Sequence, residues 1–270
     1  MEPTGRIDRG DGVELAWAHQ DGKRQDGKPP DGTRLDGTRQ DGRGPTVVFL
    51  PGFRSDMTGD KATSLAAFCA ARGQAMLRFD YSGHGASGGR FEDGTIGRWA
   101  DDALTVIDRL SEGKLVLVGS SMGGWIALLA ARARPERVAA LIGIAAAPDF
   151  TEALMWAAMD EGQRAVLMRD GVWPRPSQYG ESYPITRALI EDGRRHLLLD
   201  APIALDCPVR LLHGQADPDV PWETSLRIAE RLTGTDVQVT LVKDGDHRLS
   251  RPQDLALLHR TLAPLLQEPV

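Results

Sequence analysis

An apolar segment at 115–119 runs directly into the turn Gly-Ser-Ser-Met-Gly at 119–123, and a helical pattern follows over 122–133. In a strand–turn–helix unit of this kind, glycines flank the serine because the tight turn leaves no room for side chains beside it. The turn projects the serine hydroxyl above the sheet, and the helix N-terminus behind it favours developing negative charge. We therefore predict that Ser121 is a nucleophile.

Short apolar strands and amphipathic helices alternate on both sides of this unit. We expect strands at 46–50, 75–79, 115–119, 138–144, 209–212 and 237–242, and helices at 60–72, 96–110, 122–133, 223–232 and 253–266. This alternation is typical of right-handed βαβ units around a mainly parallel sheet with helices on both faces. The segments 6–8 and 13–18 flank a Gly-rich turn and predict an antiparallel hairpin at one sheet edge. The 270 residues thus form a single α/β domain, 1–270.

Two segments interrupt this pattern. Residues 21–45 repeat a five-residue unit that begins with Asp-Gly and holds almost no apolar side chain, which predicts a low-complexity loop. Its period matches neither a β-helix nor an EF-hand calcium site, although a calcium-binding array and a partner-binding tail remain alternatives. Residues 148–206 contain helical patterns at 152–168 and 185–199 without an obvious strand. We interpret 148–206 as a helical cap or lid inserted into the domain.

Composition narrows the functional classes. The formal net charge is −6, whereas nucleic-acid-binding proteins carry an excess of basic residues. We therefore expect no nucleic-acid partner. The longest apolar run, 138–147, is half as long as the roughly 20 residues that a spanning helix requires, so we expect no membrane span. Cys69 and Cys207 form no disulfide framework, and the first residues show neither a secretory signal nor an Arg-rich transit peptide. From these features we expect a cytoplasmic protein.

A serine nucleophile requires a histidine to accept its proton and a carboxylate to orient that histidine. Asp217 follows the apolar strand at 209–212, and His247 follows the last strand. The order Ser121, Asp217, His247 is the order of the α/β-hydrolase triad. Asp219 is two residues out of register, and Asp149, after the strand at 138–144, is the alternative acid. We expect His84 and His213, which border glycine turns, to make structural hydrogen bonds.

The sequence also supplies an oxyanion hole and a pocket. Two backbone N–H groups are required to bind the tetrahedral oxyanion. The turn provides the amide of Met122, and the Pro-Gly turn after the strand at 46–50 provides the amide of Phe53. The candidates for lining an acyl pocket are Trp125, Met155, Trp156 and Trp173, with Met159 and Tyr179 as further candidates. For those in the insertion, packing of the lid against the core is the alternative, which an apolar helical stripe more often indicates.

Several longer stretches carry a more specific resemblance. They are PGFRSDMTGDKA, RFDYSGHGASGG, VGSSMGGW, GVWPRPSQYG, CPVRLLHGQADPDVPWETS and DVQVTLVKDGDHRLS. Over about 46–262 the chain resembles the α/β-hydrolase superfamily, and within it the branch of palmitoyl-protein thioesterases and acyl-glucuronide esterases that animals target to mitochondria. The resemblance implies Ser121, Asp217 and His247 as the triad. It also implies a small-molecule or protein-linked acyl ester or thioester as substrate.

We therefore expect a serine hydrolase that needs no metal or organic cofactor. A carboxylesterase for short-chain or aromatic esters is the first alternative. A non-catalytic binding protein with the same fold is the second, although all three triad positions are filled. The sequence does not predict the oligomeric state.

Overall fold

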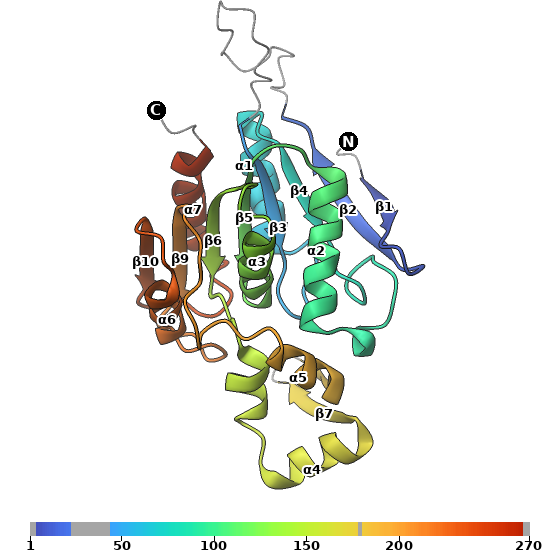
Figure 1. Cartoon of the computed structure of the whole chain (residues 1–270). Helices are drawn as coiled ribbons and strands as arrows, with labels where there is room; N and C mark the ends of the chain where they lie inside the picture. Colours follow the sequence, from blue (N-terminus) through green and yellow to red (C-terminus); the bar gives the residue numbers. More distant parts are fainter. Residues whose placement is uncertain (1–3, 23–43, 178–179, 267–270) are drawn as a thin grey trace, which may run out of the picture.

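A computed structural model describes residues 4–22, 44–177 and 180–266. Most of the 21–45 repeat, and Tyr179, lie outside these described residues. An eight-stranded sheet crosses the described part in the order β1-β2-β4-β3-β5-β6-β9-β10 (Figure 1). Its strands are β1 (Thr4–Asp8), β2 (Glu14–Gln20), β3 (Thr46–Leu50), β4 (Met76–Phe79), β5 (Leu115–Ser120), β6 (Val138–Ile144), β9 (Val209–Gly214) and β10 (Val237–Val242). The pairs β1·β2 and β2·β4 are antiparallel, and every pair from β4 to β10 is parallel. The predicted mainly parallel sheet with an antiparallel edge hairpin is confirmed.

Helices cover both faces of this sheet and create two cores. One core packs α2 (Ile96–Leu110), α3 (Met122–Ala133) and α6 (Glu223–Arg231) against the sheet, and the other packs α1 (Asp60–Arg72) and α7 (Pro252–Leu262). Successive strand side chains point to opposite faces, so Val48 and Leu50 enter the first core while Val47 and Phe49 enter the second. Because both faces are buried, these strands are continuous apolar runs.

The parallel arrangement decides where the candidate site lies. The strands β3, β5, β9 and β10 run in the same direction, so the loops that follow their last residues meet at one end of the sheet. Phe53, Ser121, Asp217 and His247 each lie just after one of these strands. Four residues that are distant in sequence are thereby placed at one edge, where ligands bind in open α/β sheets.

The insertion 148–206 projects from one end of the molecule (Figure 1). It contains a π-helix, η2 (Thr151–Trp156), then α4 (Glu161–Asp170) and α5 (Arg187–Arg194). The single helix expected at 152–168 is wrong, because Asp160 starts a new helix through a capping box with Gln163. The helix expected at 185–199 begins later, where Thr186 caps α5.

The insertion also holds a two-stranded hairpin that the sequence did not predict. Strands β7 (Val172–Ser177) and β8 (Gly180–Thr186) pair antiparallel, with Pro174 opposite Pro184. Proline lacks an N–H group and is normally excluded from the interior of a sheet, so the prolines indicated a loop. A two-stranded ribbon tolerates them because each strand has one edge without a neighbour. The expectation of a purely helical cap was therefore wrong.

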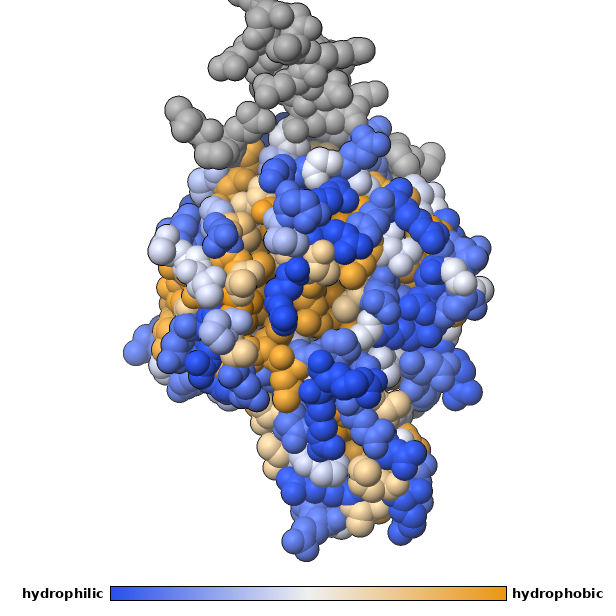
Figure 2. Space-filling view, viewed as in Figure 1, coloured by the Kyte–Doolittle hydropathy of each residue, from blue (hydrophilic) through white to orange (hydrophobic). Residues whose placement is uncertain are grey.

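Hydrophilic residues cover most of the face shown in Figure 2, and apolar residues gather in a band across the α/β body. The large hydrophobic side chains exposed in the described part are Met168, Val172 and Leu226. Within 4–22, 44–177 and 180–266 no helix combines the length and the apolar character needed to cross a membrane.

One buried carboxylate joins the two ends of the cap, and a second links the cap to the α/β body. Asp149, at the start of the cap, accepts hydrogen bonds from the N–H groups of Leu198 (2.8 Å) and Leu199 (2.9 Å) near its end. Asp192 on α5 accepts the N–H of Gly97 (2.6 Å) at the N-terminus of α2, where negative charge is favourable. The two chain connections of the cap are therefore joined by one side chain, Asp149.

Substitution Asp149→Ala is expected to lower the free energy of unfolding by about 2–6 kcal/mol, because two buried N–H groups lose their acceptor at roughly 1–3 kcal/mol each. Urea unfolding measures the change. The control is Asp170→Ala, which removes an ion pair with Arg169 on the cap surface and is expected to change stability by less than about 0.5 kcal/mol. Equal losses of unfolding free energy in the two variants would contradict the stabilising role of Asp149 at the ends of the cap.

Candidate active site

Ser121 stands at a strained turn between β5 and α3. Its backbone φ of 56° and ψ of −120° lie outside the regions that residues other than glycine favour. A Cβ atom at Gly119 would lie 2.2 Å from the Gly123 carbonyl oxygen, and one at Gly123 would lie 2.0 Å from the Leu50 carbonyl oxygen. Neither position accepts a side chain, so both flanking glycines are required by close backbone packing.

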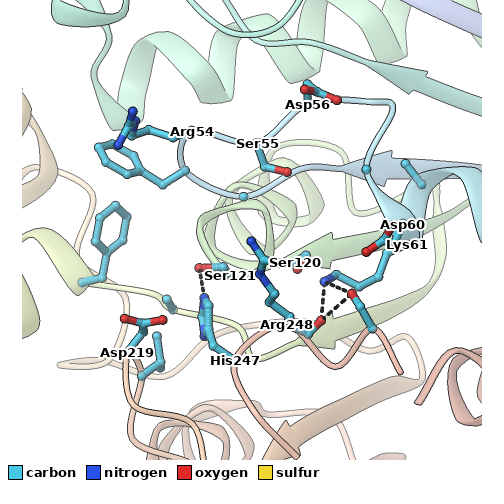
Figure 3. Close-up of a pocket in the computed structure, with 18 of the residues that line it drawn as sticks. Arg54, Ser55, Asp56, Asp60, Lys61, Ser120, Ser121, Asp219, His247 and Arg248 are labelled. Atoms are coloured by element: carbon cyan, nitrogen blue, oxygen red, sulfur yellow. Dashed lines mark hydrogen bonds between the residues drawn. The ribbon is translucent and has the colours of Figure 1, made fainter. Parts of the chain in front are cut away.

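The structure brings Ser121, His247 and Asp217 into one hydrogen-bonded line. The Ser121 Oγ lies 3.0 Å from His247 Nε2 (Figure 3), and His247 Nδ1 lies 2.7 Å from Asp217 Oδ2. In the neutral histidine, Nδ1–H donates to the carboxylate, which leaves the Nε2 lone pair facing the serine hydroxyl. The Asp217 side chain is fully buried, whereas 21% of the His247 side chain is exposed. This geometry allows the serine proton to pass to His247.

The Asp217 carboxylate is held as an anion. Burial alone would raise its pKa, but hydrogen bonds from His213 and His247 hold it well below its usual range, assisted by the Val220 N–H. Its Oδ1 atom accepts the N–H groups of Asp219 (2.8 Å) and Val220 (2.9 Å). These contacts fix the carboxylate in place and keep its charge beside His247.

The fully buried His213 contacts the same Asp217 oxygen as His247. Its Nε2 lies 3.2 Å from Asp217 Oδ2 and 3.1 Å from the Val220 carbonyl oxygen, so this nitrogen carries the hydrogen. Its Nδ1 lies 2.7 Å from the Ser225 hydroxyl, which donates to it when the ring is neutral. His213 thus makes the structural hydrogen bonds expected from the sequence, and its Asp217 contact is part of the site.

The alternative acids occupy other places. The carboxylate of Asp149 is taken up by the two N–H groups at the end of the cap. Asp219 is exposed and lines the cavity, while its backbone N–H supports Asp217. Asp217, Asp219 and His247 are also the one group of potential metal ligands among the described residues, with ligand atoms within 4.8 Å of one another. Within this group, Asp217 and His247 already bond each other and Ser121.

Met122, which carries one of the two amides predicted for an oxyanion hole, and Gly52, which precedes the other amide, lie beside Ser121. Met122 is the first residue of α3, so its N–H has no acceptor within the helix. Gly52, next to Phe53, lies so close that an added Cβ would be 3.4 Å from the Cβ of Ser121. Among the turn, loop and cap hydrogen bonds of the described residues, neither the Phe53 N–H nor the Met122 N–H is a donor. Both donors are therefore available to a ligand at Ser121.

A cavity of about 600 Å³ opens over Ser121 and His247. Its apolar lining residues are Phe49, Phe53, Ala62, Ala147, Phe150, Leu154, Met155 and Val220. Charged and hydroxyl-bearing residues line the remainder, including Arg54, Lys61, Asp219 and Arg248 (Figure 3). The cavity thus offers both an apolar and a polar environment beside the nucleophile.

Of the four residues predicted to line an acyl pocket, Met155 does so. Trp125, Trp156 and Trp173 are not wall residues of this cavity. Trp125 is buried beneath it and donates its indole N–H to the His196 carbonyl (3.1 Å). The Arg164 and Arg194 guanidiniums stack on the ring of Trp156 at 5.0 and 4.7 Å. Trp173, on β7, packs at the margin of the first core. The other candidate, Met159, is buried in that core.

The polar wall of the cavity, which includes Lys61, Tyr183 and Arg248, was not predicted from the sequence. Lys61 at the start of α1 donates to the Arg248 carbonyl, next to His247, and lies 3.4 Å from the Ser250 hydroxyl. Burial lowers the pKa of Lys61 to about 8. Tyr183 reaches the cavity from the unpredicted hairpin. Lys61 lies on a helix and Tyr183 on a strand of the insertion, without a shared motif, so no sequence signal grouped them.

Comparisons with known proteins agree with this architecture. Residues 45–175 match the family model described as the alpha/beta hydrolase fold. The human palmitoyl-protein thioesterase ABHD10, mitochondrial, is 44% identical over 241 residues, covering 88% of this chain and 78% of that protein. A putative hydrolase from Agrobacterium vitis S4 superposes with a TM-score of 0.88 at 40% identity, covering 99% of this chain and 100% of the other. The mouse ABHD10 structure gives 0.83 at 38% identity, covering 97% and 98%.

These relatives also correct one expectation. The cytoplasmic location inferred from the cysteines and the first residues is contradicted, because the similar mammalian proteins are named as mitochondrial. Neither a low cysteine count nor the composition of the first residues separates these compartments. The fold and the shared identity together establish the family: this chain is a member of the α/β hydrolases, alongside the palmitoyl-protein thioesterase ABHD10.

Proposed function

We propose that this hydrolase cleaves acyl thioesters or esters in two steps, through an acyl-enzyme on Ser121. The observation that carries the proposal is the hydrogen-bonded line from Ser121 through His247 to Asp217, at 3.0 and 2.7 Å. A serine hydroxyl is a weak nucleophile near neutral pH and becomes effective when a histidine accepts its proton during attack. The mechanism uses only side chains and backbone amides of this chain.

In the first step, the Ser121 oxygen bonds to the substrate carbonyl carbon while its proton passes to His247 Nε2. The carbonyl oxygen becomes an oxyanion, which the N–H groups of Phe53 and Met122 stabilise. The buried Asp217 carboxylate stabilises the imidazolium at the same moment. The carbon–sulfur or carbon–oxygen bond of the substrate then breaks, and His247 gives its proton to the departing thiolate or alkoxide.

In the second step, water replaces the leaving group. His247 Nε2 removes a proton from the water as its oxygen attacks the acyl carbon, and the same two amides hold the new oxyanion. The bond from the acyl carbon to the Ser121 oxygen breaks, and the proton returns to that oxygen. The products are the free acid and the starting enzyme.

The cavity supports an acyl substrate. Phe150, Leu154 and Met155, at the start of the cap, form an apolar wall beside Ser121 that suits an acyl chain. The name of the ABHD10 relatives, palmitoyl-protein thioesterase, favours a long chain. We assign residues 148–206 as a lid over this wall, with the polar lining facing the leaving group.

An esterase for short-chain or aromatic acids is the second candidate, because aromatic rings contribute to the same cavity. Phe53, Phe150 and Tyr183 all line it, and the Phe53 ring centroid lies 5.7 Å from that of Phe150 and 5.9 Å from that of Tyr183. A binding protein without activity is disfavoured, because the Ser121 hydroxyl and the His247 nitrogen are already aligned.

Substitution Ser121→Ala is expected to abolish fluorophosphonate labelling and hydrolysis of palmitoyl, octanoyl and acetyl thioesters and of an acyl glucuronide. Ser120→Ala is the matched control, because it removes the neighbouring hydroxyl and should leave labelling of Ser121 intact. Wild type is expected to prefer the long-chain thioesters or the glucuronide. Turnover of acetyl or aryl esters alone would contradict that substrate class, and an active Ser121→Ala would contradict the nucleophile.

Substitution Asp217→Asn is expected to reduce kcat by about 10³–10⁴-fold, because the amide nitrogen would face His247 Nδ1 and disturb its tautomer. Asp219→Asn, its exposed neighbour, is the matched control and should retain most activity. Equal effects of the two substitutions would argue against Asp217 as the acid.

The lowered pKa of Asp217 also makes its contribution to stability depend on pH. Because its folded-state pKa lies below its unfolded-state value near 3.9, the unfolded chain binds the extra proton in acid. The stability advantage of wild type over Asp217→Asn is therefore expected to be complete above about pH 5 and to shrink as the pH falls. Urea unfolding between pH 7 and pH 3 measures it, and an advantage that grows in acid would contradict the assignment.

A further inference from the structure

The loop that carries the Phe53 amide contains an unusual backbone conformation. Arg54 has a φ of 58°, in the left-handed region that is rare for residues other than glycine. It lies in the turn that Ser55 closes by donating its N–H to the Gly52 carbonyl at 3.0 Å. Phe53 occupies the same turn, so the direction of its amide depends on the conformation of Arg54. Such strain persists only where surrounding contacts hold it.

A histidine supplies that contact. His84 Nε2 accepts the N–H of Arg54 at 3.2 Å, and its Nδ1 lies 3.3 Å from the Ser82 carbonyl oxygen. Because a carbonyl only accepts, Nδ1 carries the hydrogen and Nε2 presents its lone pair to Arg54. Burial lowers the pKa of His84, which favours this neutral form.

The surroundings of His84 fix its position. The side chain is nearly fully buried, and its ring makes edge contacts with Trp99 and Phe91 at centroid distances of 5.1 and 5.2 Å. The turn on which it stands needs glycine on both sides. Gly83 and Gly85 both have positive φ, and a Cβ at either would collide with Arg90 or Asp80. The Ser-Gly-His-Gly segment therefore delivers one imidazole to one backbone amide.

We propose that His84 is a positioning residue for the oxyanion hole. By accepting the Arg54 N–H it holds the turn 52–55 so that the Phe53 amide points at the oxyanion formed on Ser121. His84 itself touches neither the substrate nor the reacting atoms. This inference rests on the proposed acyl-transfer function, and it adds a residue that belongs neither to the triad nor to the turn that carries Ser121.

The test compares His84→Phe with His84→Gln. Phenylalanine keeps a ring between Trp99 and Phe91 but has no acceptor, whereas the glutamine side chain still carries one. Removal of one oxyanion donor lowers kcat about 10²–10³-fold. In His84→Phe the donor is still present but misdirected, so we expect kcat to fall about 10–100-fold. His84→Gln is expected to recover most of that loss. The control His259→Phe replaces a histidine that stacks on Phe68 and does not line the cavity, and it should match wild type.

Two inhibitors separate positioning from a general structural effect. An alkyl trifluoromethyl ketone forms a serine adduct that carries an oxyanion, and a thioether of the same chain length has no carbonyl. In His84→Phe the affinity for the ketone should fall in parallel with kcat, while KM and the affinity for the thioether stay within about twofold of wild type, as for an interaction made only in the transition state. An unchanged kcat, or equal losses for both inhibitors, would overturn the proposal.

Nitrogen NMR of the wild-type imidazole tests the contact without any substitution. A neutral His84 with hydrogen on Nδ1 is expected at pH 7, and hydrogen on Nε2 would overturn the proposal even if His84→Phe does not fold. The outcomes also separate the two proposals. A wild type that neither labels with fluorophosphonate nor hydrolyses acyl substrates contradicts the proposed function, whereas an active wild type with full kcat in His84→Phe contradicts only the role of His84.

Discussion

The contact between the end of β3 and the start of α3 brings the nucleophile next to its candidate oxyanion donors. A Cβ at Gly123 would lie 2.0 Å from the Leu50 carbonyl oxygen, so α3 approaches β3 as closely as a bare backbone allows. This approach places the chain leaving β3, which carries Phe53, beside the turn that carries Ser121. This one backbone contact therefore brings the nucleophile and the segments of both candidate oxyanion donors together, while the turn 52–55 orients the Phe53 amide. Such preorganised donors need no rearrangement when charge develops.

The electrostatic half of the site is built by a second group of contacts around Asp217. Two N–H groups and two histidines surround this buried carboxylate, and only one of them, His247, faces the nucleophile. His213 and Ser225 extend the network into the body of the protein. The negative charge beside His247 is therefore fixed in place, and it favours the imidazolium that forms during acyl transfer.

The sequence was sufficient wherever one physical signal dominated. Continuous apolar runs and helical periodicity predicted the sheet, and glycines around Ser121 predicted the turn, because close backbone packing admits no other residue there. The sequence did not predict the β7–β8 hairpin, because Pro174 and Pro184 argued against strands. A two-stranded ribbon accommodates both prolines. The sequence-based prediction for Trp156 was also wrong, because a large apolar ring suggested a pocket wall while two arginines stack on it instead. The polar wall, including Lys61, depends on tertiary contacts that have no local pattern.

Mass spectrometry of the enzyme during turnover detects whether the acyl group passes through a covalent bond to Ser121. With an acyl p-nitrophenyl ester the leaving group departs readily, so hydrolysis of the acyl-enzyme becomes the slow step and the intermediate accumulates. After acid quenching, the peptide that contains Ser121 is expected to carry the mass of one acyl group, and the same peptide from Ser121→Ala none. Turnover without any acylated peptide, or an acyl group on a different residue, would contradict an acyl-enzyme on Ser121.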